Sequence, residues 1–316
     1  MFEPRPTTVR LQKHSWAFTQ SAVLFTAIEN GLFTSFSLRG DSLATIAKDA
    51  GITENNAKRM ITALLTLELV ERAGDGFCNA PDVERFLVED TRSYAGRWIT
   101  WFHHQWNAWG ELGKRLEDTG PEDPLGFYDE SFTVDHARRY HQATVSVGMG
   151  AARKFMSEVP LDGRNLLFDL GGGSGAYSIE AAKRNPGLKA VVLDLPEVVL
   201  VVSRDFIKEL GADAILMNSN LPQYSGDMIC QVLGKAFDAL APGGEMHICG
   251  EMVNEDWSGP LIPAMCSVHG VLFHSTALPH TPTDCIRYFE ETGFEDVKVR
   301  EFIPDILQHI TGCKPA

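Results

Sequence analysis

The stretch Leu167-Phe-Asp-Leu-Gly-Gly-Gly-Ser-Gly175 decides the fold of this chain. Its apolar first half predicts a buried strand, and its glycines allow a tight turn into a helix that begins near Ala176. In such a strand–loop–helix unit, a ligand can approach the loop backbone and the helix N-terminus closely. The stretch therefore predicts a ligand-binding loop in a doubly wound α/β fold.

The sequence around this loop alternates between apolar strand patterns and amphipathic helix patterns. The expected strands are 166–170, 190–194, 214–217, 245–249, 297–300 and 306–310, and the expected helices are 176–185, 197–210, 228–240 and 284–292. Alternation of this kind is typical of a mostly parallel sheet with helices on both of its faces.

Asp194 ends the second of these strands, nineteen residues after Gly175. A carboxylate at that position accepts hydrogen bonds from both ribose hydroxyls, so the pattern predicts a ligand of adenosine type. Asp169, two residues before the first glycine of the loop, favours a cationic ligand over a pyrophosphate. S-adenosylmethionine carries a sulfonium and an ammonium group and therefore fits this loop better than a dinucleotide does.

The first third of the chain predicts a helical domain with a helix-turn-helix. A short helix stops at Gly51, and Thr53 offers an N-cap for the next helix. A turn at Gly74-Asp75-Gly76 then joins two short strand-like segments, which completes the pattern of a winged helix. Such a module either binds DNA or serves as a structural or dimerisation module.

The acidic composition of the chain argues against nucleic acid and anionic lipid as partners. The chain has 42 acidic and 28 basic residues, a net charge of −14, and the second helix of the winged helix presents only Lys58 and Arg59 as cations. We expect no nucleic acid partner and no attachment to anionic lipid, because both depend on excess positive charge. No run of about 18 apolar residues predicts a membrane span. Without a signal-peptide pattern at the N-terminus, we expect a cytoplasmic protein.

Cysteine and histidine patterns give no support to a metal site. The six cysteines are scattered and form no CxxC pair, so we expect reduced thiols. The ten histidines form no HExxH motif.

Residues 96–160 predict a helical bridge that is rich in aromatic side chains. Trp98, Trp101, Trp106 and Trp109 recur at helical spacing, a pattern typical of a core or an interface and also of a substrate pocket wall. We place a domain boundary after residue 95, with a winged-helix domain over 1–95 and a second domain over 96–316. The bridge is expected to line the substrate pocket.

Four segments together resemble the plant-caffeate-type O-methyltransferase family: 167–175, 191–197, 241–245 and the winged helix. The resemblance covers nearly the whole chain. It implies an α/β fold in which a Rossmann-like seven-stranded methyltransferase domain follows an all-α winged-helix dimerisation domain. It also implies S-adenosylmethionine as cofactor, S-adenosylhomocysteine as product, a small-molecule acceptor and a homodimer formed through the N-terminal domain.

The resemblance also assigns roles to individual positions. The positions implied to bind the cofactor are Asp169, Gly171, Gly172, Gly173, Asp194, Leu195 and Asn218. Asp169 and Gly171 would lie against its methionine part, while Asp194 and Leu195 would hold its ribose and adenine. The positions implied to contact the acceptor are Tyr140, His141, Gln142, Trp106, His269 and His274. For an acidic acceptor, Arg139 and Arg153 are reserve cations.

The chain departs from the family where the catalytic base belongs. In the family, a histidine after the fourth strand deprotonates the acceptor hydroxyl, whereas the matching position here is Pro222. A supporting glutamate of the family falls near Pro279, and only Glu251, after the fifth strand, is kept. About 20 residues, enough for the third strand of the family and its turns, are absent between Gly211 and Ala212.

Two mechanisms remain open without that histidine. In the first, the acceptor is an oxygen and another residue acts as the base. The candidate catalytic residues are then His269, His274 and Glu251, with His141 as a further histidine. Alternatively, a thioether sulfur attacks the methyl group without losing a proton and becomes a sulfonium, so that positioning decides the rate. Aromatic faces like those over 98–140 favour such a cationic product.

Two branches of the family lack the base. The bacterial 4-methylthio-2-hydroxybutyrate S-methyltransferases of dimethylsulfoniopropionate synthesis methylate sulfur, and the bacteriochlorophyllide C-20 methyltransferases methylate carbon in a macrocycle. The polar Asn218, Asn220 and Gln223 suit a small acid better than a macrocycle. We rank S-methylation first, O-methylation second and C-methylation third. Outside catalysis, the alternative is a silent dimer that binds S-adenosylmethionine.

Overall fold

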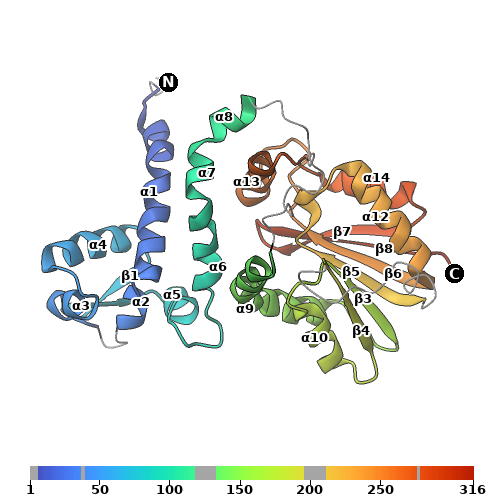
Figure 1. Cartoon of the computed structure of the whole chain (residues 1–316), viewed down its shortest axis with the longest axis horizontal. Helices are drawn as coiled ribbons and strands as arrows, with labels where there is room; N and C mark the ends of the chain where they lie inside the picture. Colours follow the sequence, from blue (N-terminus) through green and yellow to red (C-terminus); the bar gives the residue numbers. More distant parts are fainter. Residues whose placement is uncertain (1–5, 37–39, 118–132, 196–210, 276–277) are drawn as a thin grey trace, which may run out of the picture. The chain divides into compact units, whose positions relative to one another are not determined.

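The computed structural model of the chain describes residues 6–36, 40–117, 133–195, 211–275 and 278–316. The chain separates into two compact units, Met1–Gln105 and Trp106–Ala316. Figure 1 shows the course of the chain by colour. The division falls after the first helix of the expected aromatic bridge, whereas the sequence placed it after residue 95.

The described part of the first unit is helical apart from one hairpin and an isolated antiparallel bridge between Asp41 and Phe77. Its helices are α1 (Val9–Glu29), α2 (Leu32–Ser35), α3 (Leu43–Asp49), α4 (Glu54–Thr66), α5 (Pro81–Phe86) and α6 (Gly96–Trp101), followed by the 3-10 turn η1 (Phe102–Gln105), and its strands are β1 (Val70–Ala73) and β2 (Gly76–Asn79). Strands β1 and β2 pair antiparallel. Thr53 caps α4, as expected, because its hydroxyl accepts a hydrogen bond from the Asn56 N–H.

The second unit is an α/β domain. Its helices are α7 (Trp106–Gly110), α8 (Leu112–Glu117), α9 (Val134–Glu158), α10 (Ala176–Arg184), α12 (Gly226–Ala239), α13 (Leu261–Gly270) and α14 (Pro282–Glu291), with 3-10 turns η3 (Leu221–Gln223) and η4 (Val271–Phe273). Its strands are β3 (Leu166–Leu170), β4 (Lys189–Leu193), β5 (Ala212–Asn218), β6 (Leu240–Gly250), β7 (Glu295–Ile303) and β8 (Leu307–Cys313). The helix expected over 197–210 lies outside the described residues.

The strands form one mixed sheet in the order β4-β3-β5-β6-β8-β7. The first four are parallel, and β8 pairs antiparallel with both β6 and β7. Within the described residues the sheet has six strands rather than the seven of the family. Strand β6 begins at Leu240, so Pro242-Gly243-Gly244 lies inside its bounds, at an irregularity of its pairing with β5, and does not precede the strand as expected.

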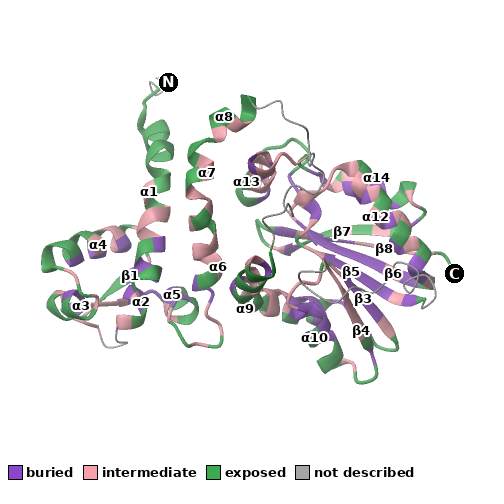
Figure 2. Cartoon of the chain, viewed as in Figure 1, coloured by how far each residue is buried: buried purple, intermediate pink, exposed green. Residues whose placement is uncertain are grey.

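Helices cover both faces of the sheet, with α9 and α10 on one face and α12 and α14 on the other (Figure 1). Consecutive side chains of a strand point to opposite faces. Leu167 accordingly joins the core under α9 and α10, and Phe168 joins the core under α12 and α14. Figure 2 shows the central strands almost entirely buried, and their carboxyl ends open into the loops that carry the predicted site.

No helix of the described residues is both long and apolar enough to cross a membrane.

Candidate functional site

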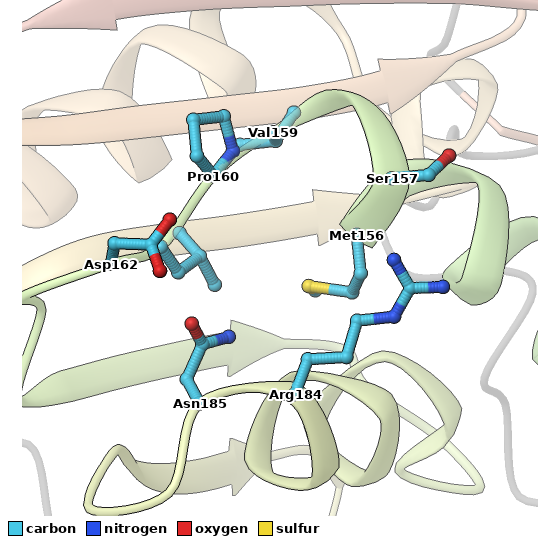
Figure 3. Close-up of a pocket in the computed structure, with 8 residues that line it drawn as sticks. Met156, Ser157, Val159, Pro160, Asp162, Arg184 and Asn185 are labelled. Carbon is cyan, nitrogen blue, oxygen red and sulfur yellow. The ribbon is translucent and has the colours of Figure 1, made fainter.

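Two hollows in the surface are lined by residues other than the predicted site residues. One, of about 350 Å³, lies between the C-terminal ends of α9 and α10, with Met156 and Arg184 among its lining residues (Figure 3). The other, of about 520 Å³, is an open depression on α4 beside Lys58 and Arg59. Neither is lined by a residue that the sequence assigned to a site.

The carboxyl ends of the parallel strands bring four predicted residues to one edge of the sheet. Asp169 lies near the end of β3, Asp194 directly follows β4, Asn218 ends β5 and Glu251 directly follows β6. The chain moves from β3 to one side to make β4 and to the other side to make β5. Such a reversal of strand order opens a crevice where α/β proteins bind ligands.

The glycines between β3 and α10 keep this crevice clear. Gly171 has a φ of 62°, and a Cβ added to it would collide with the side-chain amide of Asn220. A Cβ added to Gly172 would lie 2.6 Å from Cγ of Asp169. The backbone therefore passes close to two polar side chains, and only glycine leaves them in place.

Asp194 is held by the glycine loop. Its Oδ2 accepts a hydrogen bond from the Gly173 N–H at 2.7 Å, and its Oδ1 accepts one from the Leu195 N–H at 2.8 Å. Each carboxylate oxygen retains a further lone pair for a ligand. Three residues that the sequence assigned to the cofactor are thus connected directly, and the backbone fixes the direction of the carboxylate.

Asp169 is a buried acid, and one of its two carboxylate oxygens has no hydrogen-bond partner in the described part of the chain. Its side chain is 1% exposed, and Oδ2 accepts a hydrogen bond from Oγ of Ser178 at 2.8 Å. Its buried Oδ1 has no hydrogen-bond partner in the described part of the chain. Burial raises the pKa of Asp169 to about 6, although the Ser178 hydrogen bond opposes this. An unpaired buried carboxylate oxygen is costly, so a cationic ligand at this position would stabilise it.

Asn218 and Glu251 add further unsatisfied atoms to the same edge. Both polar atoms of the Asn218 side chain are buried and have no partner among the described residues, and the same holds for Oε2 of Glu251. Burial raises the pKa of Glu251 to about 7. Buried polar groups in native proteins are nearly always hydrogen-bonded, so these atoms mark a place for a polar ligand.

His141 lies against the glycine loop rather than beside the other predicted histidines. A Cβ added to Gly173 would lie 3.1 Å from Cε1 of the His141 ring. Both ring nitrogens are buried, and neither has a hydrogen-bond partner among the residues described. Burial lowers the pKa of His141, while the charge of Asp194 partly opposes this. The geometry therefore places His141 beside the expected cofactor residues.

The two neighbours of His141 on α9 have different surroundings. The Tyr140 ring meets the His141 ring edge-on with centroids 5.6 Å apart. Burial raises the pKa of Tyr140 to about 12, and the charges of Glu251 and Asp194 add to this effect. Gln142 is exposed, so it is not brought together with them.

His269 lies on α13, and His274 directly follows η4, the turn after that helix. The His269 ring stacks on Trp109 with centroids 5.9 Å apart, and burial lowers its pKa to about 4. Such a histidine is neutral at pH 7 and binds a proton weakly. Nε2 of His274 lies 3.3 Å from Nη1 of Arg115. Trp106 is half-buried on α7, three residues before Trp109 and hence on a similar face.

Pro222 lies in η3, at the position that the resemblance matches to the catalytic histidine of the family. The adjacent Leu221 is fully buried. Oγ of Ser275 donates to the Gln223 carbonyl at 3.4 Å, and Nε2 of His280 donates to the Tyr224 carbonyl at 2.9 Å. The loop is thus fixed by side chains from two other segments.

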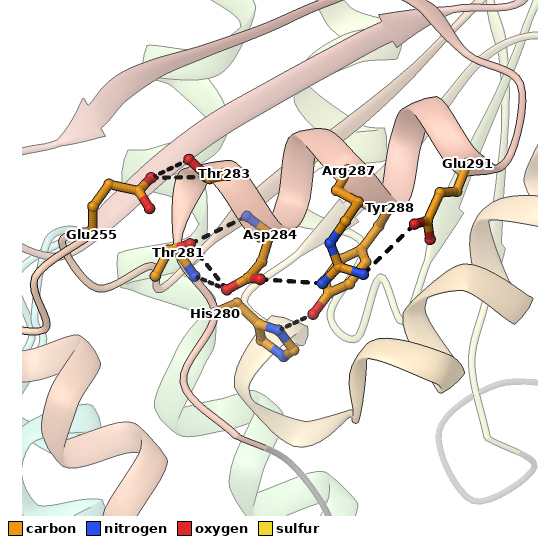
Figure 4. Close-up of polar contacts among 8 residues, drawn as sticks. All are labelled: Glu255, His280, Thr281, Thr283, Asp284, Arg287, Tyr288 and Glu291. Carbon is orange, nitrogen blue, oxygen red and sulfur yellow. Dashed lines mark hydrogen bonds and ion pairs between the residues drawn. The ribbon is translucent and has the colours of Figure 1, made fainter.

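The segment that holds the loop is itself fixed by hydrogen bonds. Nδ1 of His280 lies 3.3 Å from the Tyr288 hydroxyl (Figure 4). The same figure shows Thr281 and Asp284, which cap α14 reciprocally, and Glu255, which accepts two hydrogen bonds from Thr283. This network connects the Pro222 loop to the start of a well-anchored helix.

Two residues of this region, Arg115 and His280, were not predicted. Arg115 follows the tryptophan stripe, and a single arginine on a short helix is normally solvated. His280 is adjacent to Pro279, the position compared with the glutamate of the family, and that proximity was the available signal. The reserve cations Arg139 and Arg153 are both exposed on α9.

Comparison with known proteins identifies relatives over the whole chain. A family model for the O-methyltransferase domain matches residues 127–295, just over half of the chain. The chain is 25% identical to the tetracenomycin polyketide synthesis 8-O-methyl transferase TcmO of Streptomyces glaucescens, over 95% of this chain and 94% of that protein. It is 27% identical to the N,N-dimethyltransferase OxyT of Streptomyces rimosus, again over 95% and 94%.

Solved structures show the same fold. Human N-acetylserotonin methyltransferase, in complex with SAM, has a TM-score of 0.81 to this chain at 22% identity, and the match covers 100% of both chains. TcmO is named for an oxygen acceptor and OxyT for a nitrogen acceptor. The relatives thus share their length and architecture with this chain, while the atom that they methylate differs.

Proposed function

Because this chain belongs to the O-methyltransferase domain family, we propose that it methylates the sulfur of a small thioether acid, such as 4-methylthio-2-hydroxybutyrate, without a catalytic base. At the level of the family, the chain is an S-adenosylmethionine-dependent methyltransferase of small molecules. The choice of sulfur as acceptor is the finer part of the proposal, and it depends on the residues of the site.

The crevice at the strand ends suits S-adenosylmethionine. Asp169 has a buried, unpaired Oδ1 to face a cationic group, and Asp194 is oriented by two backbone N–H groups toward ribose hydroxyls. Gly171 and Gly172 leave room that any side chain would fill. The residues proposed to hold the cofactor are Asp169, Gly171, Gly172, Gly173, Asp194, Leu195 and Asn218.

Pro222 is the observation that carries the proposal of a sulfur acceptor. A proline side chain cannot take a proton, and η3 holds it where the family uses a histidine. The neighbouring histidines do not replace it well: burial lowers the pKa of His269 to about 4, and Nε2 of His274 accepts a hydrogen bond from Arg115. A thioether needs no base, because its sulfur has a lone pair and no proton to lose.

The protein then contributes position and electrostatics. When bound, S-adenosylmethionine supplies a methyl group; the acceptor sulfur forms the new S–C bond as the donor S–C bond breaks and returns its electron pair to the donor sulfur. One positive charge moves between sulfurs, and no proton is released. Asp169 and Asp194 place negative charge at the same edge, which stabilises a cation before and after transfer. Tyr140 adds an aromatic face.

The test is methyl transfer followed by mass spectrometry, with 4-methylthio-2-hydroxybutyrate, methionine, caffeate and a catechol as acceptors. The expected product is a sulfonium with a fixed positive charge, formed with a kcat that, at saturating S-adenosylmethionine, is independent of pH above the pKa of the acceptor carboxylate. A methylated phenol, or a steep rise in rate between about pH 6 and 8, would contradict the base-free mechanism. Absence of product with every acceptor would contradict catalysis on this panel and favour the silent binding protein.

Glu251 supports O-methylation as the second candidate. Burial raises its pKa to about 7, which is where a general base works best at neutral pH. If oxygen is the acceptor, Glu251→Gln should lower kcat about 10²- to 10⁴-fold. If sulfur is the acceptor, the same variant should keep most of its activity, so one variant separates the two candidates.

We also propose that the first unit is a winged-helix dimerisation domain. Helix α1 exposes large apolar side chains, among them Val9, Leu11 and Trp16, the last of which is 68% exposed. Apolar side chains gathered on one helix are typical of a protein–protein interface. Light scattering should give the mass of a dimer for the full chain, and Trp16→Glu should shift it toward the monomer. A monomeric wild type would contradict this part of the proposal.

A further inference from the structure

Arg115 and His274 form a pair whose donor and acceptor are fixed by chemistry. Arg115 lies on α8, and its Nη1 is 3.3 Å from Nε2 of His274. A guanidinium has donors and no acceptor, so Nε2 of His274 must accept and the ring proton must be on Nδ1. The lone pair that a general base would use is therefore turned toward a cation. His274 orients Arg115 rather than deprotonating an acceptor.

The pair lies close to the loop where the acceptor atom is expected. His274 is followed by Ser275, whose hydroxyl donates to the carbonyl of Gln223, the residue after Pro222. On the same segment, His269 stacks on Trp109, so the helices that carry Trp109 and Arg115 pack against α13 and η4. The guanidinium is thus connected by two contacts to the Pro222 loop.

The carboxylates at the strand ends explain why an acidic acceptor would need the positive charge of Arg115. Three carboxylates, those of Asp169, Asp194 and Glu251, lie at the edge that receives the cofactor. An acidic acceptor would be repelled there unless a cation held its carboxylate at a distance. Within the described ranges, no carboxylate pairs with Arg115, whereas the adjacent Lys114 is 81% exposed and bound to Glu111.

We propose that Arg115, oriented by His274, binds the carboxylate of the acceptor and selects acidic thioethers over neutral ones. This inference rests on the proposed function and names the group that its substrate must carry. The fork of a guanidinium can bind a carboxylate through two parallel N–H donors and still donate to His274. The cation holds one end of the acceptor, and the thioether sulfur at the other end reaches the methyl group.

The test compares two forms of the protein, each with an acidic and a neutral substrate. We would measure kcat and KM of the wild type and Arg115→Gln for 4-methylthio-2-hydroxybutyrate and for its primary amide. The wild type should prefer the acid by about 10- to 100-fold in kcat/KM, as expected for a charge-assisted pair. Arg115→Gln should lose most of that preference through a higher KM for the acid, with kcat nearly unchanged. Arg115→Lys should be intermediate, because it keeps the charge and loses the fork.

Two further variants control the result. Lys114→Gln removes a neighbouring cation of the same helix and should leave the acid-to-amide ratio unchanged. His274→Phe should raise KM for the acid and not for the amide, because the positioning residue acts only through Arg115. Binding of S-adenosylhomocysteine, measured by calorimetry, should be the same in all of these variants and shows that each is folded. An unchanged acid-to-amide ratio in folded Arg115→Gln would overturn the inference.

A second experiment separates failure of the proposed function from failure of carboxylate binding by Arg115, which we call the anchor. If no thioether is methylated, calorimetry on the complex with S-adenosylhomocysteine still measures binding of 2-hydroxyhexanoate, an acid of similar length. Binding to the wild type and its loss in Arg115→Gln would support the anchor alone. Absence of acid binding to the wild type complex would overturn it.

Discussion

Buried polar atoms without partners collect where the parallel strands of the second unit end. Oδ1 of Asp169, the amide of Asn218, Oε2 of Glu251 and both nitrogens of His141 share this property within the described residues. Leaving one such atom unsatisfied costs roughly 1–3 kcal/mol, so a folded protein rarely holds several together without a reason. We interpret the group as the binding surface of a polar ligand. Each residue can be tested separately.

Substitution of Gly171 should weaken cofactor binding. Gly171→Ala forces a side chain onto a residue with a φ of 62° and into the amide of Asn220. We expect the affinity for S-adenosylhomocysteine, measured by calorimetry, to fall at least tenfold, or about 1.4 kcal/mol. Gly150→Ala on α9 is the matched control, since a Cβ there meets nothing within 4 Å. Equal affinities in the two variants would contradict our assignment of the loop.

Protonation of Asp169 should weaken the binding of S-adenosylmethionine. Burial raises the pKa of Asp169 to about 6, so the free protein loses this negative charge as the pH falls through that value. We expect Kd to rise as the pH is lowered from 7.5 to 5, and Asp169→Asn to bind weakly with a flatter pH dependence in this range. A wild-type Kd that stays constant over this range would count against a cationic group at Asp169.

At the scale of elements, the geometry of α9 points three consecutive side chains in different directions. Tyr140, His141 and Gln142 are each rotated by about 100° from the one before, so the three side chains cannot all face one site. The resemblance to the family implies that all three contact the acceptor. In the structure His141 lies against Gly173 and Gln142 is exposed.

The loop that contains Pro222 depends on His280 for its position. His280 is 2% exposed and donates to the Tyr224 carbonyl. His280→Leu would leave that carbonyl without its partner, and we expect a loss of about 1–3 kcal/mol in the free energy of unfolding, measured with urea. His280→Gln can place an amide N–H at a similar distance and should recover part of the loss. If both variants are as stable as the wild type, the hydrogen bond does not hold the loop.

Local pattern predicted the elements well. The strand and glycine loop around Asp169, the N-cap at Thr53 and the end of α10 near Asn185 agree with the sequence, because short-range periodicity and capping determine them. The start of β6 was wrong, since pairing with β5 extends the strand through a Pro-Gly-Gly stretch that favours a turn. The pairing of Arg115 with His274 could not be predicted, because 159 residues separate them.

At the scale of the whole molecule, a buried histidine pair connects the sheet to α9. Nδ1 of His247 and Nε2 of His309 are 3.2 Å apart on adjacent strands, and Phe155 meets both rings edge-on. Burial, His247 and Arg300 lower the pKa of His309 to about 3, and Glu158 opposes this. The carboxylate of Glu245 lies 3.6 Å from Nε2 of His247 and also binds Arg164.

This pair should make the fold sensitive to acid. The unfolded chain protonates His309 near pH 6.5, while the folded chain does not until about pH 3, so this contribution is complete above pH 6.5 and decreases as the pH falls. The decrease approaches about 1.4 kcal/mol per pH unit for one proton. The raised pKa values of Asp169 and Glu251 act in the opposite direction, so the measured quantity is the difference between wild type and His309→Gln.

Urea unfolding at pH 7.5 and pH 5 measures that difference. His309→Gln should lose stability at pH 7.5 and lose less at pH 5, because it has no proton to take up on unfolding at this position. The same difference in stability at both pH values would show that His309 does not titrate between the folded and unfolded states.

The burial of Asp169 has a consequence for the surroundings in which the protein can work. Mobile ions weaken the attraction between exposed charges within a Debye length of about 8 Å at physiological ionic strength. They weaken the interactions of a carboxylate that is 1% exposed much less. The affinity of this carboxylate for a cationic donor should therefore depend less on ionic strength than the affinity of a site built from surface charges.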